Sequence, residues 1–162
     1  MMPVVVADTG PLIALAKLQL LSLLTSVFSY VYVPEQVAFE ATRQCERDDA
    51  QAILSFISRH GVQLENTKND WVVSLRLHLD EGEIQAIYHA KELSCGVLMD
   101  EKRGRKIASQ YDIPVIGVIG ILIEAKRLDL IDAVKPHLKK LIKYEYRLSE
   151  PLMAEALRLA EE

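Results

Sequence analysis

Four carboxylates in this sequence stand where helices or strands are expected to begin, end or face the protein interior: Asp8, Glu40, Glu83 and Asp100. Carboxylates that crowd together repel one another, so they must share protons or bind a cation. Oxygen ligands suit Mg²⁺, and a cation held by them can polarise a phosphodiester and lower the pKa of an attacking water. The chemistry that these residues favour is therefore metal-assisted hydrolysis of a phosphodiester.

Two of the acids follow short apolar runs. Residues 4–7 are Val-Val-Val-Ala and lead into Asp8, and residues 96–99 are Gly-Val-Leu-Met and lead into Asp100. Such runs are typical of strands buried on both faces of a parallel sheet. Ligands of open α/β sheets bind just beyond the carboxyl ends of the strands, so the two carboxylates converge if the strands are neighbours. The alternative is that Asp8 or Thr9 only caps the next helix.

Helical periodicity places Glu40. Val37, Glu40 and Ala41 are spaced i, i+3 and i+4 and so share one helix face. An acid on the face that the two apolar residues turn inward needs a partner, because an unpaired buried charge is costly. The partner is either a bound cation or, if Glu40 lies at the edge of the apolar stripe, a basic side chain such as Arg43.

The segment around Glu83 predicts a helix start. Asp80 with an acid three positions later is a capping-box pattern, and the helix dipole also favours carboxylates in a first turn. Glu83 shares a helix face with Ala86 and Ile87, which turns it toward the interior. Capping and metal binding therefore compete as explanations of this acidic turn.

A basic segment follows Asp100. Lys102, Arg103, Arg105 and Lys106 place four cations within five positions. One explanation is a solvated helix start. The other is a cationic rim that guides a phosphodiester backbone toward the acids.

The elements that must position these residues alternate along the chain. Apolar runs predict strands at about 4–7, 30–33, 62–64, 96–99 and 114–117, with amphipathic helical patterns between them. The alternation favours one α/β domain over residues 1–162, with a mostly parallel sheet. Two further helices within about 129–162, the first beginning near residue 129, are expected to pack on the body of the domain or on a partner.

Composition narrows the class of protein. The 162 residues are 50% hydrophobic and 26% charged, with a net charge of −4, which argues against a protein that holds nucleic acid by bulk charge alone. No apolar run reaches the ~18 residues of a membrane span, and no basic region precedes an apolar core at the N-terminus. Cys45 and Cys95 lack metal-ligand spacing, and the four histidines are scattered. We therefore expect a cytoplasmic chain without a membrane partner and without a zinc site.

Five segments resemble, in order, those of PIN-domain proteins, of the kind related to the ribonuclease toxins of VapBC toxin–antitoxin pairs and, more narrowly, a prokaryotic branch of PIN-like proteins. The resemblance implies a three-layer fold with a central, mostly parallel sheet flanked by helices. It also implies that the acids bind Mg²⁺ or Mn²⁺ for the cleavage of single-stranded RNA. The segments span most of the chain and are ADTGPLIALAK (7–17), VPEQVAFEAT (33–42), LDEGEIQAI (79–87), LMDEKRGRKIA (98–108) and IPVIGVIGILIEAK (113–126).

By this resemblance the four acids named at the outset are the metal ligands and catalytic residues, directly or through water. Thr9 matches the small hydroxyl residue beside the family's first acid, and it is expected to form hydrogen bonds within the site. Glu81 and Glu101 offer second choices at the two later acid positions. Helical phase favours Glu83 over Glu81, and Asp100 is preferred to Glu101 because it directly follows the apolar run.

The resulting hypothesis is a divalent-metal-dependent endoribonuclease of the toxin type, in which Arg103 or Arg105 contacts a phosphate of the RNA substrate. The resemblance also implies two further partners, a small antitoxin protein and a second copy of the chain. The alternative is a catalytically weak or inactive PIN-like module that binds RNA or protein.

Overall fold

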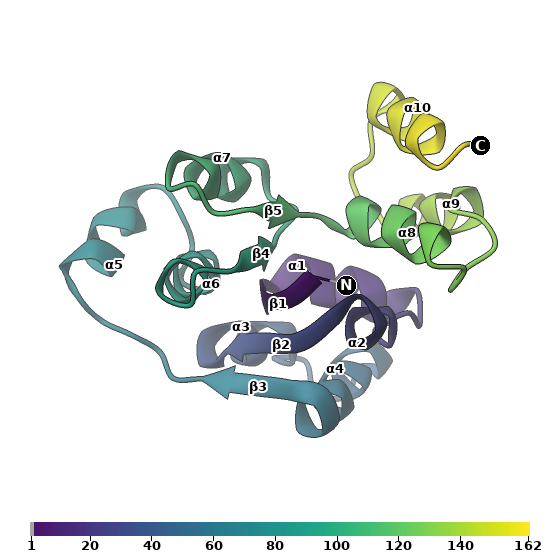
Figure 1. The fold of residues 1–162 in the computed structure, drawn as a ribbon. Coiled ribbons are helices and arrows are strands. Elements are labelled where there is room, and N and C mark those ends of the chain that lie inside the picture. The colour runs from purple at the N-terminus through teal and green to yellow at the C-terminus, as the bar shows by residue number, and fades with distance from the viewer. Residues whose placement is uncertain (1) are drawn as a thin grey trace.

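The computed structural model describes residues 2–162, and its centre is one sheet (Figure 1). The sheet has five strands in the order β3-β2-β1-β4-β5, and every neighbouring pair is parallel. The predicted mostly parallel α/β sheet is therefore confirmed. The strands are β1 (Met2–Ala7), β2 (Phe28–Pro34), β3 (Gly61–Leu64), β4 (Gly96–Leu98) and β5 (Val115–Ile116).

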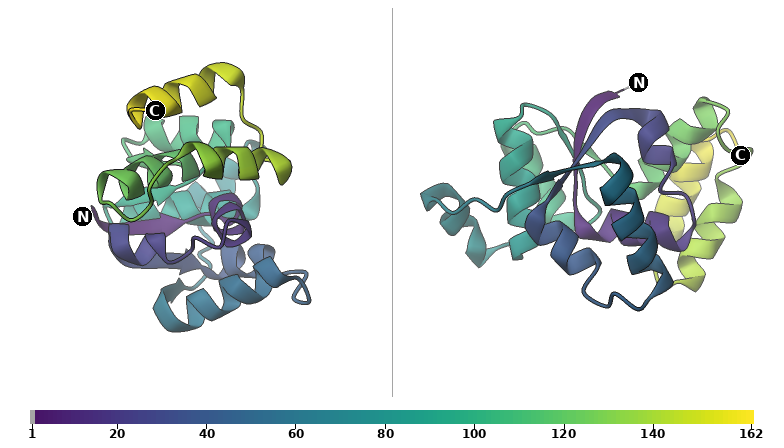
Figure 2. Two further views of the ribbon diagram at one scale, coloured as in Figure 1. Left: turned by 90° about the vertical axis from the view of Figure 1, so that its right-hand side faces the viewer. Right: turned by 90° about the horizontal axis from the view of Figure 1, so that it is seen from below.

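Helices cover both faces of the sheet. One layer holds α6, which packs on β1, β2 and β4, together with α7. The other holds α1, which contacts α4 and α8, and α2, which contacts α8. Seen from below in Figure 2, the strands lie between the teal helices and the green-to-yellow C-terminal helices. The helical elements are α1 (Thr9–Lys17), α2 (Leu23–Val27), α3 (Glu35–Ala41), α4 (Asp48–His60), α5 (Asp70–Ser74), the 3-10 turn η1 (Leu75–Leu77), α6 (Glu81–Glu92), α7 (Lys102–Gln110), α8 (Val118–Arg127), α9 (Lys135–Lys143) and α10 (Glu150–Leu159).

The central strands are apolar throughout because both of their faces are covered. Val5, Val6 and Ala7 of β1 and Val97 and Leu98 of β4 have no exposed surface. Burial of this kind is the main favourable contribution to folding. It also fixes the register of the strands. A slip of one residue would move every side chain to the opposite face of the sheet and would misplace the acids that follow the strands.

The topology creates a crevice beside β1. The chain goes from β1 outward to β2 and β3, then crosses the sheet to β4, which pairs with the other edge of β1 in the register Val6↔Val97 and Ala7↔Leu98. The order of the strands thus reverses between β1 and β4, and ligands of open α/β sheets bind at such a point. The strands that precede Asp8 and Asp100 are therefore neighbours.

The C-terminal part begins its first helix later than expected. The pattern predicts a helix from about residue 129, whereas α9 begins at Lys135. Asp129 has a left-handed backbone conformation with φ 57°, which ends the preceding helix and cannot continue a right-handed one. Pro136 lies in the first turn of α9, where a missing N–H costs nothing.

The last residue of the chain ties α10 to its neighbours. Glu162 accepts hydrogen bonds from the backbone N–H groups of Val134 (2.6 Å) and Lys135 (3.0 Å), so it caps α9. It also pairs with Lys126 of α8 at 3.1 Å. The C-terminal helices thus pack on α8 in this structure. Among residues 2–162, no helix is both long enough and apolar enough to cross a membrane.

Candidate active site

Asp8 occupies the joint between β1 and α1. Its extended backbone donates an N–H to the carbonyl of Leu98 across the β1–β4 pair, at 2.9 Å. Asp8 is 5% exposed, and its side chain makes no N-cap hydrogen bond to α1, so it does not serve as a helix cap. Burial raises the pKa of Asp8 to about 7 against an opposing hydrogen bond from the Thr9 backbone, and the charges of Asp80, Glu40 and Asp100 raise it further.

Glu40 is half-buried on α3 and is fixed by two hydrogen bonds. Thr9 Oγ1 donates to its Oε2 at 3.1 Å, and Gln36 Nε2 donates to its Oε1 at 3.0 Å. A Cβ added at Gly82 would collide with the Glu40 carboxylate, so this carboxylate lies directly against the first turn of α6. Arg43, the alternative partner, lies over the ring of Phe39 instead, 5.3 Å from its centroid.

Glu83 and Asp80 form a carboxyl pair at the start of α6. Asp80 accepts the backbone N–H of Glu83 at 2.8 Å, which confirms that Asp80 is the N-cap. Burial raises the pKa of Glu83 to about 9, helped by a hydrogen bond with the Asp80 side chain and by the charges of Asp80 and Asp8. The Asp80 carboxylate therefore lies directly beside the Glu83 carboxyl group. Asp80 thus belongs to the acid cluster, although its sequence pattern indicates only a cap.

The competing acids at these positions lie toward solvent. Glu81 is exposed and pairs with Arg76 at 2.9 Å. Glu101 is exposed as well, although its charge raises the pKa of Glu83. The buried Glu83 and the half-buried Asp100 are therefore the members of each pair that face the cluster.

Asp100 lies in the loop between β4 and α7, under the start of α8. Its Oδ1 accepts the backbone N–H of Val118 at 3.0 Å. Its Oδ2 is buried and has no hydrogen-bond partner among residues 2–162. Burial raises the pKa of Asp100, while the Val118 N–H and the nearby Tyr146 and Arg105 side chains oppose the shift.

Tyr146 lies at the site and, like the role of Asp80 in the cluster, was not predicted from the sequence. It belongs to the loop that follows α9, is partly buried, and approaches Asp100 from the C-terminal part of the chain. Burial raises the pKa of Tyr146 above its usual value, and the charge of Asp100 adds to the effect. No local pattern marks Tyr146, because only the packing of the C-terminal segment on α8 brings it to the site.

The two arginines that were expected to contact phosphate are separated. Arg105 points into the site, where its Nη1 donates to the Met99 carbonyl at 3.1 Å beside Asp100. Arg103 is exposed, and its Nη1 donates to the carbonyl of His78, on the η1 side of α7, at 3.3 Å. Only Arg105 therefore lies within the acid cluster.

The donors that the cluster offers fit a hard divalent cation. Its carboxylates come from the end of β1, α3, α6 and the β4–α7 loop, neighbouring acids help to raise the pKa values of Asp8 and Glu83, and one buried oxygen, Oδ2 of Asp100, lacks a partner among residues 2–162. No group of three or more His, Cys, Asp or Glu side chains in the described part of the chain is already arranged to hold a metal ion. Such donors suit a cation like Mg²⁺, which takes one or two carboxylates and keeps several waters.

Gly117 makes the close approach around Asp100 possible, which a substitution can test. A Cβ at this position would lie 2.6 Å from both Arg105 Nη1 and Asp100 Oδ1. We expect Gly117→Ala to lower the free energy of unfolding by about 1–3 kcal/mol, because these side chains must shift. Gly10→Ala is the control, since a Cβ there would meet nothing within 4 Å. Urea denaturation of both variants measures the difference, and equal stability would contradict the crowding.

The comparison with known protein families bears on this arrangement. A family model described as a PIN domain matches residues 4–162. No curated protein is significantly similar to the chain. Because the match covers nearly the whole chain, the protein belongs to the PIN-domain family, whose members are generally metal-dependent nucleases.

Proposed function

We propose that this protein is a divalent-metal-dependent endoribonuclease that hydrolyses phosphodiester bonds of single-stranded RNA. The observation that carries the proposal is the convergence of Asp8, Glu40, Glu83 and Asp100 at the crevice between β1 and β4, where their burial and mutual repulsion raise the pKa values of Asp8 and Glu83. Acids whose pKa values are raised by burial and by neighbouring charges are typical of functional sites.

Each residue of the site has a role in this proposal. Asp8, Glu40, Glu83 and Asp100 would hold Mg²⁺ or Mn²⁺, directly or through water. When bound, the metal would neutralise charge on the phosphate and lower the pKa of an attacking water. Thr9 holds the Glu40 carboxylate in place through its 3.1 Å hydrogen bond.

Arg105 supplies a positive charge beside Asp100. Because its guanidinium already lies beside Asp100 and Met99, it can contact a non-bridging phosphate oxygen without a large rearrangement. Below their raised pKa values of about 7 and about 9, Asp8 and Glu83 bind protons when no cation is present, and they must release them when one enters. Metal binding is therefore expected to be stronger at higher pH.

We further propose that the protein is the toxin-type component of a toxin–antitoxin pair, with a small antitoxin protein and a second copy of the chain as partners. The support for these finer assignments is the resemblance of the ordered segments to toxin-related PIN domains. A PIN-like module that binds RNA or protein without cutting it is the competing function.

A cleavage assay tests the nuclease proposal. The purified protein is incubated with one unstructured and one structured labelled RNA, in Mn²⁺, in Mg²⁺ and in EDTA. We expect internal cuts in the unstructured RNA with metal and none in EDTA. If gels show no cleavage of either RNA and calorimetry shows no binding of Mn²⁺, the binding module is the better description.

A further inference from the structure

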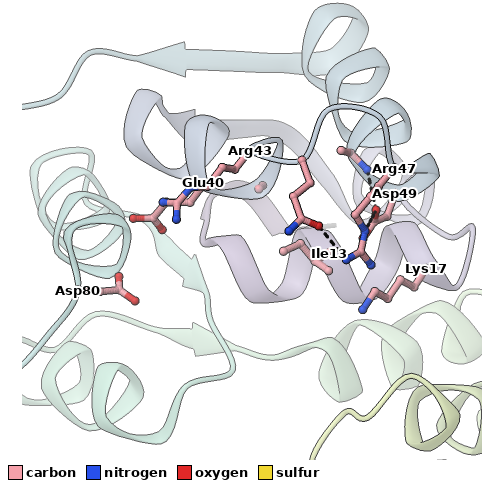
Figure 3. Close-up of a pocket in the computed structure, with 10 residues that line it drawn as sticks. Ile13, Lys17, Glu40, Arg43, Arg47, Asp49 and Asp80 are labelled. Atoms are coloured by element: carbon pink, nitrogen blue, oxygen red, sulfur yellow. Dashed lines mark hydrogen bonds and ion pairs between the residues drawn. The ribbon is translucent and has the colours of Figure 1, made fainter.

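A cavity of about 590 Å³ opens from the acid cluster along α1 and α3 (Figure 3). Glu40 and Asp80 line the end that meets the cluster, Arg43 reaches toward Glu40 in Figure 3, and Lys17 lines the opposite end. In the close-up, Asp80 and Glu40 lie on one side and Lys17 lies far from them along the cavity. The cavity therefore changes from acidic to basic along its length.

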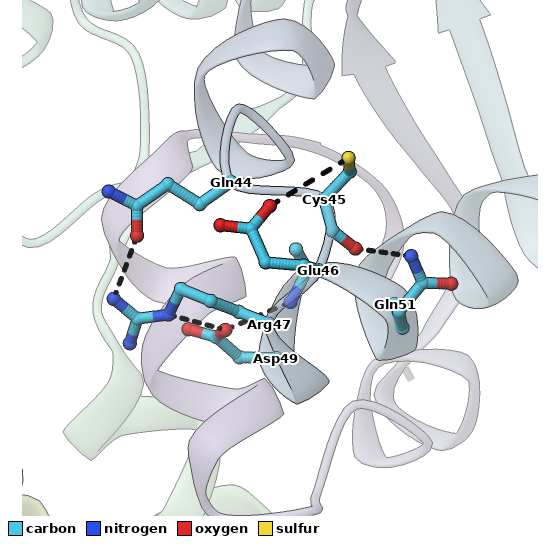
Figure 4. A network of polar contacts seen from close by, with 7 residues as sticks. Gln44, Cys45, Glu46, Arg47, Asp49 and Gln51 are labelled. Carbon is cyan, nitrogen blue, oxygen red and sulfur yellow. Dashed lines mark hydrogen bonds and ion pairs between the residues drawn. The ribbon is translucent and has the colours of Figure 1, made fainter.

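The loop between α3 and α4 forms one wall of this cavity and is fixed by its own polar contacts (Figure 4). Arg47 pairs with Asp49 at 3.2 Å and donates to the Gln44 side chain, while Gln51 donates to the carbonyl of Cys45. The charges of Arg47 and Asp49 thus largely cancel. Away from the acid cluster, Arg43 and Lys17 remain as the uncompensated charges of the cavity.

The basic surface continues beyond this cavity to α9. A second cavity of about 320 Å³ shares Lys17 and is lined also by Lys140, Lys143 and Tyr144, with no acidic residue in its lining. Tyr144 is 47% exposed. In the described part of the chain, none of Lys17, Lys140 and Lys143 forms an ion pair.

We propose that Arg43, Lys17, Lys140 and Lys143, here called the basic track, bind successive phosphates of the RNA strand on one side of the scissile bond. Cations that line a groove together with an exposed aromatic ring suit a single strand that has both phosphates to neutralise and bases to stack. An adjoining cavity shares Lys17 with the track, and its acids, Glu46, Asp48 and Asp49, belong to the α3–α4 loop and the first turn of α4. The proposal rests on the proposed function, because the acid cluster is what places the reacting phosphate at the end of the track.

A third cavity makes the arrangement two-sided. It has a volume of about 780 Å³, lies between η1 and α7, and is lined by Lys102, Arg103 and Lys106 as well as Glu101 and Tyr111. The first cavity of the track is lined mainly by residues of α1, α3 and the α3–α4 loop, whereas this cavity is lined by residues of α5, η1, α7 and the segments next to them. A strand held in both would cross the acids in its middle, so cleavage would fall at internal bonds.

Binding of a labelled oligonucleotide tests the track without relying on catalysis. Fluorescence anisotropy of a 5′-fluorescein oligouridine of about 20 nucleotides is measured in EDTA over a series of salt concentrations. We expect Lys17→Gln/Lys143→Gln to weaken binding at least about tenfold and to reduce the slope of log K against log salt by about 1.4, or about 0.7 for each lost phosphate contact. Thermal denaturation checks that the variant is folded.

The control removes two charges elsewhere. Lys68→Gln/Lys91→Gln changes two exposed lysines that line none of the three cavities, and its affinity should stay within about twofold of the unmodified protein. Equal affinity and equal slope for the two double variants would overturn the track. An unmodified protein that binds no RNA at all would also overturn it, and an acidic protein would then be the better candidate for binding these cations. If only the nuclease proposal fails, the result is different. The unmodified protein would then bind the oligonucleotide more tightly than Lys17→Gln/Lys143→Gln does, but it would not cleave RNA in Mn²⁺.

Discussion

Asp8→Asn should abolish metal-dependent cleavage of RNA while leaving the fold intact. The substitution removes the one carboxylate whose pKa responds to Glu40, Asp80 and Asp100 together. Loss of a residue that only orients a metal ligand typically costs about 10–100-fold in affinity or activity. Removal of a ligand itself should therefore lower the cleavage rate at least about a hundredfold at fixed Mn²⁺.

The free energy of unfolding of Asp8→Asn should not fall. Lost cleavage with unchanged stability would show that Asp8 has a functional role and not a structural one. Asp8 is 5% exposed and its side chain does not cap α1, so a neutral amide of the same shape loses no helix cap. The buried charge is itself unfavourable. Above about pH 7, Asp8→Asn should be at least as stable as the metal-free protein, as measured by urea denaturation.

Two further substitutions serve as matched partners for this experiment. Glu83→Gln should reduce cleavage as Asp8→Asn does, because Glu83 is buried in the cluster. Glu81→Gln, in the same helix turn, loses only an exposed ion pair with Arg76 and should change stability by less than about 1 kcal/mol and cleavage little. Full activity in Asp8→Asn, or equal losses in the two glutamate variants, would sink the assignment of the acids.

The placement of the acids on β1 and α6 was predictable because it depends on local periodicity. A buried apolar run leads into Asp8, and helical phase separates Glu83 from Glu81. The apolar run and the helical phase each depend on only a few neighbouring residues. They therefore do not depend on how the helices and strands pack, as long as the same faces are buried. The same reasoning correctly puts the strand before Asp100 in the sheet.

Other parts of the site depend on packing between distant segments, which local patterns do not carry. Tyr146 reaches Asp100 only because the C-terminal helices pack on α8. The close contacts at Gly82 and Gly117 depend on how α3 and α7 approach the starts of α6 and α8. The dual role of Asp80 was hidden for a different reason, since its capping pattern already explains the residue completely.

The metal-free protein should become less stable as the pH rises from about 5 to about 9. Burial raises the pKa of Asp8 to about 7 and that of Glu83 to about 9, so between the unfolded and folded pKa values the native state binds more protons than the unfolded chain. The free energy of unfolding therefore decreases with pH across this window and levels off above it. Each pH unit over which only the native state is protonated is worth about 1.4 kcal/mol, and about two such units lie between pH 5 and the Asp8 pKa of about 7, so Asp8 alone lowers the free energy of unfolding by about 3 kcal/mol in this window.

Urea denaturation in EDTA at about pH 5.5, 7 and 8.5 measures this dependence. The same measurement on a Glu83 variant, and on the protein with Mn²⁺, identifies the groups that cause it. Glu83→Gln should flatten the part of the curve above about pH 7, because only the Glu83 carboxyl still releases protons there. Mn²⁺ should raise the free energy of unfolding most at about pH 8.5. At this pH the ionised acids repel one another unless a cation is bound, and fewer protons have to be released when the cation binds. A metal-free protein whose stability is constant or rises over this range would show that the carboxyl groups are not held together as the structure has them.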